Sequence, residues 1–117
     1  MTERKKLYNA IHKELRRRTI ELFGEWCFIC GSTDVIQGGH VIPAGSCLNT
    51  RFMMEPPNIL PQCRKCNGKH RYNQSPFIAK YIEWFGLDEF RELEKQSRII
   101  KQYKISELRE LLKEVKK

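Results

Sequence analysis

Two pairs of cysteines constrain the fold of this chain more than any other feature. Cys27 and Cys30 form one C-x-x-C pair, and Cys63 and Cys66 form a second. Two such pairs can place four thiolates around one zinc ion at tetrahedral geometry, which leaves no open coordination position. We therefore predict a structural zinc site that stabilises the fold and performs no chemistry. Four thiols without a metal are the alternative, which the ligand spacing of both pairs disfavours.

The 32 residues between Cys30 and Cys63 form a longer stretch than a compact zinc ribbon usually contains. We therefore expect the zinc to join the two ends of an inserted hairpin and loop. A fifth cysteine, Cys47, lies within this stretch, and we interpret it as a free thiol without an assigned role. Because the zinc site is closed, any chemistry must lie in the segment that it clamps.

The chain carries a large excess of basic residues. It contains 22 lysines and arginines against 14 aspartates and glutamates, a net charge of +8 in 117 residues. Such an excess on a small domain favours a polyanionic partner, most commonly nucleic acid; a basic protein without such a partner is the alternative. No apolar run approaches the ~20 residues that cross a bilayer, and no signal peptide follows the charged N-terminus. We therefore expect a cytoplasmic protein with no membrane partner.

The N-terminal segment is predicted to be a basic helix. Apolar residues recur at helical spacing between Thr2 and Phe23, and neither glycine nor proline interrupts them. Cations crowd the opposite face, so we expect Arg16, Arg17 and Arg18 to contact DNA. A solvated charged face is the alternative.

The middle of the chain, residues 24–74, sustains no helical period. Short apolar runs at 35–37 and 40–42 flank Gly38-Gly39, which predicts a β-hairpin with a two-residue turn at the glycines. A short helix is expected from about Lys65 to Arg71.

The C-terminal part is predicted to be helical. Ser75 can cap a helix that runs to Phe85, Asp88 can cap one that runs to about Tyr103, and Ser106 can cap the last. The last helix has one apolar stripe, which favours core packing over a dimer contact. These patterns predict one compact α+β domain. Its segments are a basic N-terminal helix (1–24), a zinc-braced core (25–74) and a C-terminal helical segment (75–117).

Within the clamped region, Gly39-His40, Asn58 and Cys63-x-x-Cys66-Asn67 follow one another in order. This order resembles the HNH endonucleases, also called His-Me finger or ββα-metal nucleases. The resemblance implies a small zinc-braced ββα-metal (HNH) core with His40 as general base. It also implies Asn58 as the hydrogen-bond partner that orients His40, and Asn67 as a ligand of a catalytic Mg²⁺ or Mn²⁺.

The chemistry of these side chains is consistent with those roles. A neutral imidazole can accept a proton from water near neutral pH. An amide carbonyl can fix the tautomer of that imidazole without adding charge. A hard divalent ion prefers oxygen ligands, and at the scissile phosphate it would stabilise the transition state and the leaving oxygen.

A closer resemblance is to the NinG family of lambdoid phages, the Rap recombination nucleases. Members of that family cut branched DNA, so the resemblance implies a metal-dependent endonuclease of recombination intermediates and, for a phage-encoded protein, the host cytoplasm. Junction resolution usually needs two strand cuts, which makes a homodimer attractive. The shared features, which span about Glu25 to Gly86, are Cys27-x-x-Cys30, Gln37-Gly38-Gly39-His40, Arg51-Phe52, Asn58-Ile59, Gln62-Cys63-x-x-Cys66-Asn67 and Tyr72-Asn73.

The chain departs from the HNH pattern at Gly39. Many HNH enzymes have an aspartate there that supplies the second metal ligand, whereas the NinG-like pattern also has glycine. The candidate substitutes are His70, Asn73 and Glu55. We prefer His70 because it follows Asn67 by one helical turn.

Several of these side chains have alternative roles. Arg51 can clamp a phosphate, or it can pair with Glu55 at the surface. Asn58 can form a turn, and Asn67 can cap a helix. The remaining candidates are basic contacts to DNA at Lys69, His70 and Arg71.

Three functions are compatible with these features. The first is a metal-dependent DNA endonuclease, and the second is a non-catalytic zinc module that binds nucleic acid. The third is a scaffold that uses zinc for stability. The order of His40 and Asn58 favours the first over the second, and the net charge of +8 disfavours the third.

Overall fold

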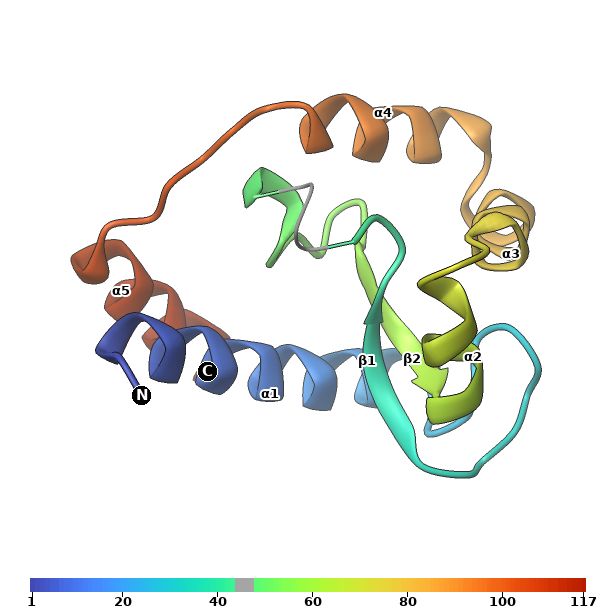
Figure 1. Cartoon of the computed structure of the whole chain (residues 1–117), viewed down its shortest axis with the longest axis horizontal. Helices are drawn as coiled ribbons and strands as arrows, with labels where there is room; N and C mark the ends of the chain where they lie inside the picture. The colour runs from blue at the N-terminus through green and yellow to red at the C-terminus, as the bar shows by residue number, and fades with distance from the viewer. Residues whose placement is uncertain (44–47) are drawn as a thin grey trace.

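The computed structural model describes residues 1–43 and 48–117, so the predicted free thiol at Cys47 lies outside the described residues. The architecture is α+β, with helices on both faces of a two-stranded sheet (Figure 1). The elements are α1 (Glu3–Phe23), β1 (Ile36–His40), the 3-10 turn η2 (Leu48–Thr50), β2 (Ile59–Cys63), α2 (Arg64–His70), α3 (Ser75–Phe85), α4 (Leu87–Ser97) and α5 (Ile105–Lys116).

The sheet differs from the predicted hairpin. β1 and β2 are antiparallel, with Ile36 opposite Cys63 and His40 opposite Ile59. The predicted turn at Gly38-Gly39 is therefore wrong, because both glycines lie inside β1 and the partner strand begins only at Ile59.

Close packing explains why these two strand positions are glycines. A Cβ atom at Gly38 would lie 3.2 Å from the Cβ of Arg16 in α1, and a Cβ at Gly39 would overlap the Oε1 atom of Gln62. A glycine inside a strand commonly marks such a close approach. The Gly-Gly pair thus permits contact on both faces of β1 and does not reverse the chain.

Helix α1 lies across one face of the sheet, and its predicted boundaries are confirmed. The Thr2 hydroxyl caps its first turn by accepting a hydrogen bond from the Lys5 N–H. Further along, the guanidinium of Arg16 donates to the carbonyl of Ile36 at 2.6 Å. The hydroxyl of Thr19 donates to the carbonyl of Ile59 at 3.0 Å. These bonds tie α1 to both strands.

Helix α5 packs beside the N-terminal half of α1 (Figure 1). Leu108 and Val115 from its apolar stripe are buried in one cluster with Ile11 and Leu15 of α1. The prediction that this stripe belongs to the core is confirmed. Burial of apolar surface between the two helices stabilises the position of α1 against the sheet.

Helix α2 contacts both strands, and side chains of α3 and α4 pack against the face of the sheet that points away from α1. Successive strand residues point to opposite faces, so Leu60 faces away from the neighbouring Ile59 and from α1. The buried side chains that pack with Leu60 come from the segment after α1 and from α3 and α4: Phe28, Phe77, Tyr81, Phe90 and Leu93.

The helix boundaries are close to the predicted ones, but the predicted caps are wrong. Gln74 and Gly86 occupy the N-cap positions of α3 and α4, so Ser75 and Asp88 lie inside these helices. α4 ends at Ser97, six residues before the predicted Tyr103. α5 begins at Ile105, where the Glu107 carboxylate accepts a hydrogen bond from the Lys104 N–H at 3.0 Å, so the predicted Ser106 cap is replaced. Among the described helices, none is long and apolar enough to cross a membrane.

Candidate active site and metal centre

The four paired cysteines converge where α2 begins. Their Sγ atoms all lie within 4.8 Å of one another. The Sγ atoms of Cys30 and Cys63 are 3.8 Å apart, and a tetrahedron with Zn–S bonds of about 2.3 Å has edges of about 3.8 Å. The four thiols, which come from segments far apart in the sequence, are therefore placed to hold one metal ion such as zinc.

The cysteine cluster is partly closed to solvent. Cys27 and Cys63 are buried, whereas Cys30 is exposed. Burial raises the pKa of Cys63 and Cys66, and the neighbouring thiols raise that of Cys66 further. For Cys27, burial is outweighed by backbone N–H groups that bring the pKa to about 7. Four adjacent thiols cannot all ionise unless a cation replaces their protons, which is the condition that zinc satisfies.

His40 lies at the C-terminal end of β1, and one side of its ring is fixed. Its Nε2 atom is 2.9 Å from the carbonyl oxygen of Arg51. Because a carbonyl oxygen only accepts hydrogen bonds, Nε2 carries the proton in the neutral ring. The lone pair therefore resides on Nδ1, which is the atom able to act as a base.

The imidazole of His12, from α1, stacks on that of His40 with the ring centroids 5.2 Å apart. The pKa of His40 is lowered to about 4, chiefly by burial and also by the nearby His12 and Arg51, against the opposing effect of the bond to the Arg51 carbonyl. Burial also lowers the pKa of His12, with a hydrogen bond to the Gly38 backbone opposing. Both rings are consequently neutral at physiological pH.

Asn58 makes contacts that differ from the predicted one. Its Oδ1 atom accepts a hydrogen bond from the Ile42 N–H at 2.8 Å. Its Nδ2 atom donates to the carbonyls of Ile42 and Thr50 at 3.1 and 3.0 Å. A fully buried amide must satisfy its donors and acceptor locally, and here the backbone does so. Asn58 thus fixes the segment that carries the Arg51 carbonyl, and that carbonyl contacts His40.

His40 opens onto a basic groove of about 540 Å³ between α1 and α2. Among the described residues, the lining includes three cations and two histidines but no acidic side chain. The guanidinium of Arg51 lies 4.4 Å from the centroid of the Tyr8 ring, and among the described residues no ion pair joins Arg51 to Glu55. The lining residues are Tyr8, Asn9, His12, Lys13, Arg16, Gly38, His40, Arg51 and Asn67.

A larger cavity, of about 660 Å³, lies beside α5 and lacks the predicted chemistry. Its lining includes Glu107, Glu110 and Glu114. These carboxylates would repel a phosphate backbone. The smaller groove is therefore the better candidate for a nucleic-acid site.

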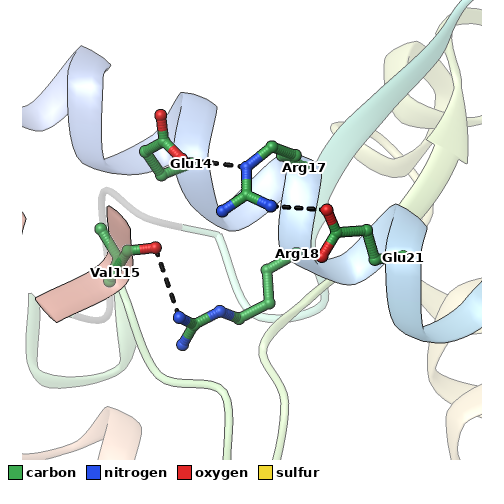
Figure 2. Close-up of polar contacts among 5 residues, drawn as sticks. All are labelled: Glu14, Arg17, Arg18, Glu21 and Val115. Carbon is green, nitrogen blue, oxygen red and sulfur yellow. Dashed lines mark hydrogen bonds and ion pairs between the residues drawn. The ribbon is translucent and has the colours of Figure 1, made fainter. Parts of the chain in front are cut away.

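The three consecutive arginines of α1 point in different directions. Arg17 forms ion pairs with Glu14 and Glu21, at 3.0 and 2.5 Å, and Arg18 donates to the carbonyl of Val115 in α5 at 3.3 Å (Figure 2). Successive residues of an α-helix are rotated by about 100°, so three neighbours cannot share one face. Of the three, Arg16 is the one that lines the groove, and it also donates to Ile36.

Asn67 and His70 of α2 share a second hollow, of about 270 Å³, with His40. The Nδ2 atom of Asn67 donates to the Oε1 atom of Gln37 at 2.8 Å, which leaves Oδ1 for another partner. The Nε2 atom of His70 is 2.8 Å from the carbonyl oxygen of Val41, so it carries the proton. The buried Nδ1 of His70 has no hydrogen-bond partner within the described ranges. An amide oxygen and an unpaired ring nitrogen suit a divalent cation.

The other ligand candidates lie elsewhere. The Oδ1 atom of Asn73 accepts a hydrogen bond from the Ser75 N–H at the start of α3, and Glu55 is exposed. Arg71 lines the hollow that contains His40, whereas Lys69 is exposed and lines a small cavity on the other side of His70. Of the three candidates considered, His70 alone shares a cavity with Asn67.

His12, like Tyr8 and Asn9, is a groove residue that the sequence did not reveal. Its position on α1, one turn after Tyr8 and one before Arg16, is the only available signal, because these residues fall on one helical face. This helical face can be assigned to the groove only when α1 is known to lie across β1.

A family model described as Bacteriophage Lambda NinG protein matches residues 2–117 of the chain. The match covers α1, the paired cysteines, the His40 groove and the C-terminal helices. No curated protein and no solved structure shows significant similarity to the chain.

Proposed function

The chain belongs to the family of the bacteriophage lambda NinG protein, and we propose that it is a metal-dependent DNA endonuclease with His40 as general base. One observation carries the proposal. His40 is a neutral imidazole held by a backbone carbonyl in a groove whose described lining includes three cations and no acidic residue. The order β1, β2, α2, with His40 ending the first strand and Asn67 on the helix, also supports an HNH-type core.

In this proposal the Nδ1 atom of His40 accepts a proton from the attacking water. Nε2 keeps its own proton on the Arg51 carbonyl, so the ring stays oriented as Nδ1 becomes protonated. A pKa of about 4 keeps the base neutral but makes it weak. An anionic phosphate in the groove would raise that pKa toward neutrality, because a nearby negative charge favours the imidazolium.

The cations of the groove would bind and position the phosphodiester. Lys13 is an exposed residue of α1, and Arg51, from the segment between β1 and β2, lines the same groove. Stacking on Tyr8 holds the Arg51 guanidinium in a fixed orientation. A guanidinium held in this way can donate two hydrogen bonds to one phosphate.

The residues of α2 fit a divalent cation such as Mg²⁺ or Mn²⁺. We assign its binding to the Oδ1 atom of Asn67 and the Nδ1 atom of His70, on the evidence of the unpaired buried nitrogen and the shared hollow. When bound, such an ion supplies positive charge to the scissile phosphate and the leaving oxygen. Zinc in the cysteine cluster would hold the start of α2, and hence both side chains, in place.

The proposed substrate is branched DNA, such as a recombination intermediate. This part of the proposal rests on family membership. Resolution of a junction requires two cuts, so we propose a homodimer on the DNA, which the mass of the complex with a four-way junction would test. One protein chain per junction would contradict it.

Nicking of supercoiled plasmid and cutting of a four-way junction test the proposal directly. We expect cleavage with Mg²⁺ or Mn²⁺, and loss of about 10²–10⁴-fold in rate for His40→Ala. His40→Gln is the matched control, because it keeps a polar side chain but supplies no base. Equal cleavage by wild type and His40→Ala would reject the base assignment. DNA binding without cleavage at any metal would favour the non-catalytic zinc module instead.

A further inference from the structure

Gln62 is an unusual buried residue. It precedes the zinc ligand Cys63 in β2, and its side chain is fully buried. Neither its Oε1 nor its Nε2 atom has a hydrogen-bond partner in the described part of the chain. An unpaired buried amide is unfavourable, since both atoms lose their hydrogen bonds to water. A buried polar group without a partner in the chain is commonly satisfied by an ordered water or a bound ion.

The Gln62 side chain occupies the position of the side chain that Gly39 lacks. A Cβ atom placed on Gly39 would overlap Oε1 of Gln62 and would lie 2.9 Å from its Cδ atom. The three nearest atoms to that Cβ all belong to Gln62. An amide oxygen from β2 therefore stands where a side chain at position 39 would begin.

The same face of the sheet carries the contact to Asn67. Gln37 is opposite Gln62 in the strand register, and residues 37 and 39 point to the same face because they are two apart. Gln37 also accepts the hydrogen bond from Asn67 Nδ2. Gln62 therefore lies on the face of the sheet that meets α2, the helix that carries Asn67 and His70.

We propose that the side chain of Gln62 supplies an oxygen ligand to the divalent cation, in place of an acidic residue at position 39. The inference rests on the proposed function, because it concerns the cation that Asn67 and His70 would bind. The three ligands would all be neutral. Binding in the absence of DNA should therefore be weaker than at a site with a carboxylate, and the phosphodiester would add the missing negative charge.

The test is a Mn²⁺ titration of the full-length, zinc-loaded chain, with free Mn²⁺ followed by electron paramagnetic resonance. Gln62→Leu keeps the shape of the side chain and removes the oxygen. We expect it to weaken Mn²⁺ binding by about tenfold or more. The substitution should also raise the melting temperature of the Mn²⁺-free protein, because an unpaired buried amide is replaced by an apolar group. Addition of Mn²⁺ should then raise the melting temperature of the variant by less than that of wild type.

A reciprocal exchange provides a second, independent arm. Gly39→Asp alone should weaken Mn²⁺ binding and lower the melting temperature, because its Cβ overlaps Gln62. Gly39→Asp combined with Gln62→Gly removes all three of those contacts and restores an acidic ligand. We expect the double variant to bind Mn²⁺ at least as tightly as wild type, with Gln62→Gly alone as the matched control.

Unchanged Mn²⁺ affinity in Gln62→Leu, with its zinc content and fold intact, would overturn the assignment and show that Gln62 only fills space beside Gly39. That result is distinguishable from failure of the proposed function. Wild type would then still bind Mn²⁺ and cut DNA. If wild type neither bound Mn²⁺ nor cut DNA, the cation site and the ligand assignment would both be rejected.

Discussion

The cysteine cluster and the His40 groove lie at opposite ends of the same two strands, and they depend on the rest of the chain to different degrees. Each half of the cysteine cluster is a local motif, so the cluster needs only two short segments to meet. The groove takes its lining from α1, β1, α2 and the segment that contains Arg51. The comparison teaches that a metal site of closely spaced ligands can be predicted from spacing, whereas a groove depends on how distant helices pack.

The largest expected effect is loss of the cysteine cluster. Cys63→Ser should unfold the domain, because structural zinc contributes about 10 kcal/mol in small zinc domains, comparable with the whole free energy of unfolding. Elemental analysis should find one zinc per wild-type chain and none in the variant, and circular dichroism should report the unfolding.

Cys30→Ser distinguishes a zinc site from simple packing. Cys30 is exposed, so a packing role predicts almost no effect, whereas a ligand role predicts the same loss as Cys63→Ser. A stable, zinc-free Cys30→Ser protein would contradict the structural-zinc proposal.

On the groove side, the Arg51 side chain should affect cleavage without affecting the fold. Arg51→Ala removes the guanidinium but keeps the backbone carbonyl that holds His40. We expect cleavage to slow by about 10–100-fold, within the range for loss of a charged contact to phosphate. Arg51→Lys keeps the positive charge but lacks the planar guanidinium, so its cleavage rate should lie between those of wild type and Arg51→Ala. Equal rates for all three proteins would remove Arg51 from the site.

A smaller effect should separate the two sides of α1. Lys13 lines the groove, whereas Arg17 is paired with Glu14 and Glu21. In DNA-binding titrations at several salt concentrations, Lys13→Ala should reduce the slope of log K against log salt by ~1. Arg17→Ala is the matched control and should leave the slope unchanged. The reverse result would place DNA on the other face of α1.

The smallest expected effect is a change in the pKa of His40. His12→Ala exposes one face of the His40 ring to water, so its pKa should rise from about 4 toward the usual 6.5, as measured by NMR titration of the metal-free protein. His12→Phe keeps the stacking and the burial and should leave the pKa low, because burial is its largest cause. A low pKa in His12→Ala would show that His12 does not shield the ring.

The same burial makes stability depend on pH. The folded-state pKa of His40 and of His12 lies below the unfolded value near 6.5. The unfolded chain therefore takes up protons first, and the stability of the protein should fall as the pH is lowered from about 6.5 toward 4.

Residues whose role is set locally were predictable. The C-x-x-C spacings, the capped helix α1 and the short helix α2 follow from patterns within a few residues. Gly38-Gly39 was misread because a glycine pair indicates a turn unless the helix above it and the side chain beneath it are known. Arg17 and Arg18 have partners within the chain that could not be predicted, because the sequence shows adjacent charges but not which face of α1 meets α5.

Only some of the groove residues could be predicted from the sequence. His40 and Asn67 were found through an ordered motif, and the structure places both at the groove. The Arg51 carbonyl could not be predicted as the partner of His40, since every residue has a carbonyl and only the folded chain selects one. His12 and Gln62 have no motif around them, and their positions depend on contacts between segments.

The contact between Gly38 and α1 limits how this fold can be rearranged. Because the Cβ of Arg16 would stand only 3.2 Å from a Cβ at position 38, the strand and the helix fit each other as a matched pair. Residues 25–74 grafted alone into another nuclease would leave one wall of the groove behind. In a graft from a relative with a larger residue at position 38, this helix would have to shift by a few tenths of an ångström or more. Helix α1 and the β1–β2 sheet should therefore be exchanged together, although they are separate segments of sequence.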